Sequence, residues 1–224
     1  MKRSIKILSV VAIVSAVALS AVSCASVQKP SGFLDGYYKD MTPMKEMEFT
    51  WMRWKKPGVD FSKYDKLMLD GVVFYLSPES QDKGIDPDVM KDLADTFNLD
   101  MVNAVKDKYP VVAEPGPDVM RIKFALTGIK QSRPVLSGAT TIIPAGLAIS
   151  IVKKGATGEW SGSGATGSEV MAIDSMTNDV IAVAQTEYIA GFTERFTEYG
   201  SAKDAFKFWA GKLRYLLDKV HGVN

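Results

Sequence analysis

The chain has 224 residues, of which 46% are hydrophobic and 24% are charged, and its formal net charge is +1 at pH 7. This composition is typical of a folded globular protein and excludes a disordered chain. Without the three basic residues of its first segment, the chain has 24 of its 27 lysines and arginines and 26 acidic residues, which gives a net charge of −2. Nucleic acid binding needs concentrated positive charge, so we expect no nucleic acid partner.

Residues 1–23 follow the pattern of a bacterial signal peptide. Lys2, Arg3 and Lys6 form a positive start, and a largely apolar stretch from residue 7 to residue 19 follows it. That stretch is shorter than the roughly 20 apolar residues that span a bilayer. The segment therefore predicts export and cleavage rather than a membrane-spanning helix.

Cys24 is the expected lipid attachment site and the first residue of the mature protein. The preceding Ala21-Val22-Ser23 fits a lipobox, although Ala21 stands where leucine is usual. Fatty chains such as palmitate on Cys24 would anchor the protein stably and would leave no free thiol, because the chain has one cysteine. Ala25 rather than aspartate follows, which favours the outer membrane facing the periplasm.

After the signal peptide we expect a lipidated tether over residues 24–32 and a single domain over residues 33–224. Residues 33–63 contain seven aromatic residues without a clear period. They predict an irregular segment that wraps the domain and inserts side chains into it.

The next elements are a strand over residues 67–76 and a long helix. Asp86 is a good N-cap, Pro87 suits the first helical position, and an apolar stripe follows it. We expect this helix to end near Lys108, because Pro110 lies two residues further on.

A turn at residues 115–117 leads into a half-buried strand over residues 120–127, where apolar and polar side chains alternate. Residues 137–152 are apolar and rich in small residues, and they predict a buried connection that includes a short helix.

A β-hairpin is expected from residues 169–173 and 180–185, with Asn178 taking the left-handed conformation in its turn. A second helix closes the chain. Its apolar residues recur at helical spacing, at positions 202, 205, 206, 209, 213, 216, 217 and 220. This order predicts an α+β (or α/β) two-layer sandwich, with a mixed, mostly antiparallel sheet and two main helices on one face.

Two local patterns could be either ligand-binding motifs or ordinary structural segments. Gly162, Gly164 and Gly167 match the glycine spacing of a dinucleotide cradle, but a hairpin rather than a helix is expected to follow them, so we interpret them as a loop or strand. Residues 51–56 interleave tryptophans with basic residues. A base-stacking platform or a membrane-surface contact is open for them, but we favour tryptophans packed on the core beside solvated charges.

The sequence offers no catalytic set. His221 is the only histidine and lies four residues from the end, so no serine–histidine or cysteine–histidine site can be built away from that tail. Aspartates at 86, 88, 174 and 179 lie where caps and turns favour aspartate. We therefore expect no enzyme, no cofactor and no metal site, with a hydrolase of an envelope polymer as the remote alternative.

Several segments together resemble a known family. They are residues 31–35, 64–68, 115–122, 169–179 and 208–214. In their order and spacing the chain resembles the bacterial putative lipoproteins grouped as domain of unknown function 3313. The resemblance departs at Thr177-Asn178-Asp179, where the family tends to have Thr-Gly-Glu. It implies a lipoprotein with no established activity and no catalytic residues to transfer.

Three functions stay open at this point. The strong anchor and the missing catalytic set favour a non-catalytic envelope lipoprotein that acts as an adaptor or accessory subunit for an unknown envelope protein. The alternative is a periplasmic module that binds lipid or another apolar ligand, with residues 137–152 as a pocket wall. An enzyme would instead show acidic side chains converging in a cleft, with a raised pKa.

The anchor gives the first testable prediction. A palmitate analogue fed to cells should label the full chain, and a Cys24→Ala variant should lose all label because no other thiol exists. A Ser26→Ala variant controls for changes near the site and should keep the label. An unmodified thiol at position 24 in the native protein would overturn the assignment.

Overall fold

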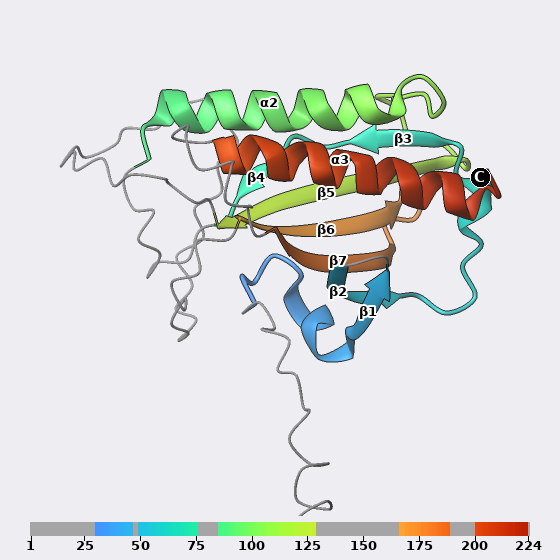
Figure 1. Ribbon diagram of the computed structural model, residues 1–224. Coiled ribbons are helices and arrows are strands. Elements are labelled where there is room, and N and C mark those ends of the chain that lie inside the picture. The colour runs from blue at the N-terminus through green and yellow to red at the C-terminus, as the bar shows by residue number, and fades with distance from the viewer. Residues whose placement is uncertain (1–29, 47–48, 76–84, 129–165, 189–199, 224) are drawn as a thin grey trace, which may run out of the picture.

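The computed structural model describes residues 30–46, 49–75, 85–128, 166–188 and 200–223 (Figure 1). Seven strands form one sheet: β1 (Thr42–Glu46), β2 (Phe49–Lys55), β3 (Lys66–Leu69), β4 (Val73–Phe74), β5 (Val119–Gly128), β6 (Thr166–Asp174) and β7 (Val180–Tyr188). The helical elements are the 3-10 turns η1 (Asp35–Asp40) and η2 (Phe61–Lys63) and the helices α2 (Pro87–Val105) and α3 (Gly200–Val220).

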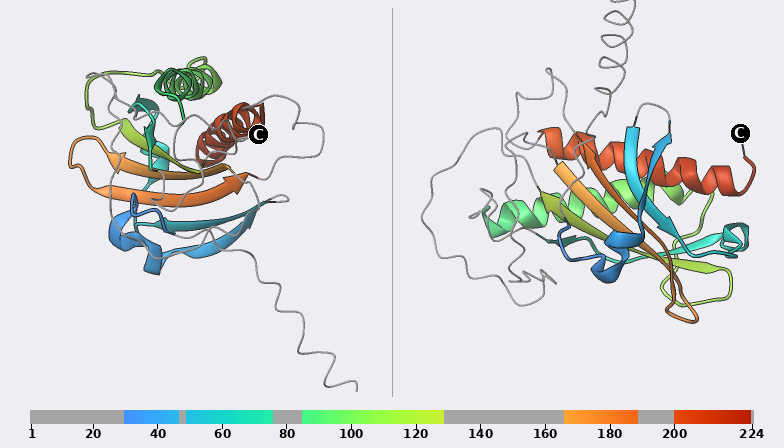
Figure 2. Two further views of the ribbon diagram at one scale, coloured as in Figure 1. Left: turned by 90° about the vertical axis from the view of Figure 1, so that its left-hand side faces the viewer. Right: turned by 90° about the horizontal axis from the view of Figure 1, so that it is seen from below.

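The sheet is mixed and mostly antiparallel. Its strand order is β1-β2-β7-β6-β5-β3, and β4 also pairs with β5. Only the pairings of β3 and β4 with β5 are parallel. Helices α2 and α3 lie side by side on one face, and the segment from residue 30 to β1 lies on the other (Figures 1 and 2). The expected two-layer α+β sandwich, with two main helices on one face, is confirmed.

The main core lies between the two helices and the sheet. Phe97 of α2 is fully buried at its centre, with ring centroids 5.2 Å from both Phe124 and Phe206. Trp209 of α3 completes this aromatic group at 6.4 Å from Phe97. Among the described residues, no helix is both long and apolar enough to cross a membrane.

The expected start of α2 is confirmed by its capping contacts. The Asp86 carboxylate accepts a hydrogen bond from the Asp88 backbone N–H at 2.8 Å, and Pro87 occupies the first turn. The helix ends at Val105, three residues before the predicted end, and residues 106–108 form a turn. The apolar stripe is buried at 90, 93, 97, 101 and 105.

The hairpin of β6 and β7 also forms as expected. Asn178 has φ 60°, the left-handed conformation that a short polar side chain tolerates. Asp174 fixes the turn by accepting hydrogen bonds from the backbone N–H groups of Met176 and Thr177.

The continuous strand expected over residues 67–76 is wrong, because the backbone leaves the sheet between β3 and β4. The Val72 N–H donates to the Asn98 side chain of α2 at 3.0 Å instead of to a strand. Asp70, just before the break, accepts two hydrogen bonds from the Arg121 guanidinium at 2.8 Å. The side chains of a helix and a strand thus replace the ladder at this point.

Two further expectations need correction. Residues 33–63 are not irregular throughout, since they include β1 and β2 at one edge of the sheet. Strand β5 is not half-buried in its second half, because Ala125 and Thr127 are buried as well as Phe124 and Leu126. The outer face of β5 is covered there, since Ala125 pairs with Glu169, to which the N-terminal segment binds.

The aromatic centre gives a stability prediction. Phe97→Ala should lower the free energy of unfolding by about 3–5 kcal/mol, because it removes a buried ring and leaves a cavity. Leu99→Ala on the same helix is the matched control, because Leu99 is 60% exposed. Its effect should stay within about 0.5 kcal/mol. Urea denaturation of both variants measures the difference, and equal losses would contradict the placement of Phe97.

Candidate functional site

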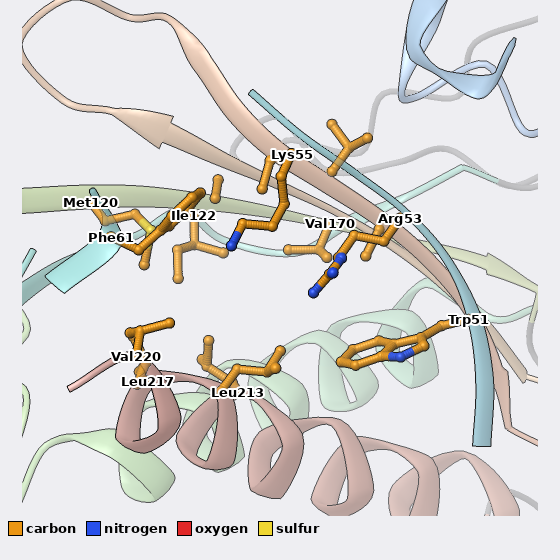
Figure 3. A pocket seen from close by; sticks show the side chains of 15 residues that line it. Trp51, Arg53, Lys55, Phe61, Met120, Ile122, Val170, Leu213, Leu217 and Val220 are labelled. Atoms are coloured by element: carbon orange, nitrogen blue, oxygen red, sulfur yellow. The ribbon is translucent and has the colours of Figure 1, made fainter. Parts of the chain in front are cut away.

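An apolar groove runs between α3 and the part of the sheet that the helices leave uncovered (Figure 3). Strands β6 and β7 form its floor, α3 forms one wall, and β2 forms the opposite rim. Without the open solvent above it, the groove has a volume of about 160 Å³, and nearly all of its surface is carbon. None of the residues that line it carries a carboxylate, hydroxyl, thiol or imidazole.

Small side chains make the floor hollow. Ala172 of β6 pairs directly with Ala182 of β7, and Ala184 pairs with Val170. All four residues line the groove. Three methyl groups therefore occupy a surface that larger strand residues would fill, so the open space follows from the residue types at these paired positions.

The second half of α3 supplies the wall. The apolar stripe expected for this helix divides into two parts: Ala202, Phe206 and Trp209 are buried in the core, whereas Leu213 and Val220 remain partly exposed. The latter residues line the groove together with Leu216 and Leu217. Leu217 is itself buried in the core, so the wall combines one buried leucine with partly exposed neighbours.

The rim carries the charge of the site. Because side chains alternate along a strand, Trp51, Arg53 and Lys55 of β2 share the face of the groove (Figure 3). Trp54 lies on the opposite face, with its ring centroid 4.8 Å from that of Tyr37. The expected packing of tryptophan on the core therefore holds for Trp54, whereas the basic residues border an apolar groove rather than solvent alone.

Lys55 is held over an aromatic ring at one end of the groove. Its ammonium lies 4.3 Å from the centroid of the Phe61 ring, a cation–π distance. Burial, and then the neighbouring charge of Arg53, lowers the pKa of Lys55 below its ordinary value. The two cations thus lie near each other beside a low-dielectric wall.

A buried carboxylate lies on the opposite face of the sheet. Glu169 of β6 is fully buried and accepts hydrogen bonds from four donors. The Ser31 hydroxyl donates at 2.6 Å, the Tyr38 hydroxyl at 2.8 Å and the Gln185 amide at 2.9 Å. These contacts bind the N-terminal segment to the sheet from Ser31 onward, seven residues after Cys24.

Burial determines the titration of this cluster. Desolvation raises the pKa of Glu169, although the hydrogen bonds from Ser31 and Tyr38 oppose that shift. Burial, followed by the charge of Glu169, raises the pKa of Tyr38 to about 12. A raised pKa is also expected of a catalytic acid. The Glu169 carboxyl group, however, is fully buried and does not face a cleft that a substrate could enter.

The other candidates from the sequence have structural roles or lie outside the described residues. Asp179 pairs with Lys56 at 2.7 Å, and the Nδ1 atom of His221 lies 2.7 Å from the Leu217 carbonyl at the end of α3. Gly167 belongs to β6, so a strand follows the glycine pattern, as the sequence indicated. Within the described part of the chain, no group of three acidic, histidine or cysteine residues could hold a metal ion.

Cys24, Gly162, Gly164 and the expected pocket wall at 137–152 lie outside the described residues. The sequence interpretation did not identify the groove. A signal for its rim was present, because Trp51, Arg53 and Lys55 recur with the period of a strand. The alanines at 182 and 184 show the same period, but no sequence pattern places them opposite α3.

Comparison with known proteins places the chain in a family without assigned activity. The family model described as "Protein of unknown function (DUF3313)" matches residues 29–213. The uncharacterized lipoprotein YdcL of Escherichia coli K12, and that of strain O157:H7, is 26% identical over 133 residues. The match covers 58% of this chain, which thus spans about 60% of the length of these curated relatives.

Among solved structures, the PelC dodecamer from Paraburkholderia phytofirmans is similar to this chain with a TM-score of 0.37 and 10% identity. The match covers 72% of this chain and 96% of that chain.

The Glu169 cluster yields a testable prediction. Glu169→Ala should lower the free energy of unfolding by about 1–3 kcal/mol, because it leaves buried donors without their acceptor. Hydrogen exchange should accelerate at residues 31–38, which lose their attachment to the sheet. Asp92→Ala is the control, because it removes only the exposed ion pair with Lys203, and it should change little.

A Glu169→Gln variant separates shape from charge. Because the pKa of Glu169 is raised in the fold, the folded state keeps the proton to higher pH than the unfolded state does. The stability that the protonated group contributes is therefore lost as pH rises through the raised pKa. The wild-type chain should lose stability relative to Glu169→Gln over that pH range in urea titrations, and parallel pH profiles would contradict the shift.

Proposed function

We propose that this chain, which belongs to the DUF3313 family, is a lipid-anchored envelope module that binds the hydrocarbon part of an amphiphilic ligand in the groove between α3 and β2. The observation that carries the proposal is the apolar lining of the groove, which is open at one side and hollow at its floor. An apolar surface of this kind is stabilised when a ligand removes it from water.

The anchor supports the envelope location. The curated relatives are lipoproteins, and Cys24 lies at the position where a lipobox places the acylated residue. Ser31 is seven residues along the chain from Cys24, a stretch that spans at most about 25 Å, so the domain would stay close to the bilayer. Ala25 favours the periplasmic side of the outer membrane as its address.

The residues of the groove support binding rather than catalysis. Nucleophilic and acid–base catalysis need a nucleophile and a base within reach of each other. The lining offers hydrocarbon side chains, Trp51, Arg53 and Lys55. We therefore propose a non-catalytic role. A polymer hydrolase has less support, because the buried Glu169 faces away from the groove.

The groove also changes the order of the two binding hypotheses. An adaptor needs a contiguous docking surface, whereas the exposed large apolar side chains on the described elements, such as Leu99 of α2 and Met176 of the hairpin turn, belong to separate elements. We therefore place the adaptor role second and the ligand-binding role first.

The energetics set a scale for the ligand. Each buried methylene contributes about 0.8 kcal/mol, so an acyl chain of ten methylenes contributes about 8 kcal/mol. Association itself costs at least about 4 kcal/mol. A hydrocarbon chain alone would thus bind weakly in a groove that stays open at one side, and a second contact is needed for tight binding.

Quenching of tryptophan fluorescence tests the groove directly. The full chain, incorporated into phosphatidylcholine nanodiscs, should be quenched by ω-bromoundecanoate, because the bromine of a bound chain would lie near the Trp51 ring. Trp51→Phe should remove the quenched component. Ala182→Leu, which fills the floor, should weaken binding by roughly tenfold, since the added side chain takes the place of ligand methylenes.

Ala113→Leu is the matched control, because it adds the same atoms at an exposed loop position. It should leave the quenching titration unchanged, and a thermal melt should show that both leucine variants are folded. Equal quenching of the wild-type chain and Ala182→Leu would mean that the probe quenches from the lipid phase, and the proposed function would then be wrong.

A further inference from the structure

The rim of the groove contains two cations. Arg53 and Lys55 project from β2 toward the hollow, opposite Leu213 and Leu217 of α3 (Figure 3). Among the described residues, no carboxylate lies within ion-pair distance of either side chain. Several other cations of the described chain do have an acidic partner, such as Lys56 with Asp179, Arg121 with Asp70 and Arg214 with Asp218.

The register partners of the two rim cations on the neighbouring strands carry no charge. On the β7 side, Lys55 pairs in register with Ala182, and Arg53 pairs with Ala184. On the β1 side, Arg53 pairs with Thr42, whose hydroxyl donates to the Arg53 backbone carbonyl at 3.4 Å rather than to a charged group. Four apolar residues face the groove from α3: Leu213, Leu216, Leu217 and Val220.

Two like charges beside an apolar wall are unfavourable without a partner. Partial desolvation and then repulsion by Arg53 disfavour the charged state of Lys55, and these two causes lower the pKa of Lys55. A negative group between the two cations would remove the repulsion and would accept charge-assisted hydrogen bonds from the guanidinium and the ammonium. The site is therefore complementary to an anion that carries a hydrocarbon chain.

We infer that the groove is specific for a single-chain lipid with an acidic head group, which contacts Arg53 and Lys55 while its acyl chain lies along Leu213 and Leu217 over the alanine floor. This inference rests on the proposed function and adds the charge of the ligand to it. A neutral amphiphile would leave the two cations unpaired, and a cationic one would add a third positive charge to the rim.

The same chain length with three head groups tests the inference. ω-Bromoundecanoate, ω-bromoundecanol and ω-bromoundecyl-trimethylammonium are titrated into the full chain in phosphatidylcholine nanodiscs, and quenching of Trp51 is measured. The acid should bind roughly tenfold more tightly than the alcohol, the gain expected from one charge-assisted contact. The trimethylammonium compound should bind more weakly than both, and added salt should reduce only the advantage of the acid.

Variants at the rim assign the effect to the two cations. Arg53→Gln and Lys55→Gln should each reduce the preference for the acid and leave binding of the alcohol unchanged. Lys56→Gln is the matched control, because this next residue along the chain pairs with Asp179 away from the groove. The Arg53→Glu/Lys55→Glu double variant should reverse the preference in favour of the trimethylammonium compound, a gain that an unfolded chain could not show.

The outcomes separate the two proposals. If none of the three compounds quenches Trp51, the groove does not bind an acyl chain, and the proposed function fails. If all three quench equally and the rim variants change nothing, the groove binds hydrocarbon without regard to charge, and only the present inference fails. Preference for the acid that survives in the double glutamate variant would also overturn it.

Discussion

The groove depends on a constraint of size: two helices cannot cover a sheet of this width. Six strands at about 4.8 Å spacing span roughly 25–30 Å, whereas two helices of about 10 Å diameter cover about 20 Å. Helices α2 and α3 pack over β5 and its neighbours, with Phe97 at the centre of their contact. Among the described elements, strand β2 is then left without a helix above it, and Leu213 and Val220 on the side of α3 that lines the groove stay partly exposed. An apolar hollow with one helical wall is the direct consequence.

The opposite face of the sheet is covered by the N-terminal segment instead of by helices. There, the N-terminal segment covers the sheet with Leu34, Tyr37 and Tyr38, and the buried Glu169 carboxyl binds Ser31 and Tyr38. A buried carboxyl without donors would be costly, so the segment and Glu169 stabilise each other. The segment that leads back to Cys24 therefore joins the sheet on the face away from the groove.

The parts of the fold that depend on neighbouring residues could be predicted from the sequence. The N-cap at Asp86, the turn at Asn178 and the apolar stripe of α3 are all local signals, and the structure contains each of them. The break between β3 and β4 could not be foreseen, because its cause is Asn98, which is distant in sequence and binds the Val72 backbone. The edge strand β1 and its neighbour β2 were also missed, because residues 33–63 show no clear alternation of apolar and polar side chains.

The groove could not be predicted from the sequence for the same reason, because it depends on contacts between distant segments. Its rim lies within one strand, and the period of Trp51, Arg53 and Lys55 was visible in the sequence, but the charge pattern alone fitted a solvated face equally well. Only the packing of α3 against the sheet turns that face into the border of a hollow. Leu213 and Val220 of α3 gain a role at the same step, because they lie beyond Trp209 and stay partly exposed, whereas Leu217 between them is buried in the core. A partly exposed apolar wall, and two cations with no acidic partner among the described residues, are each unfavourable in water, and a single chain with an acidic head would satisfy both at once.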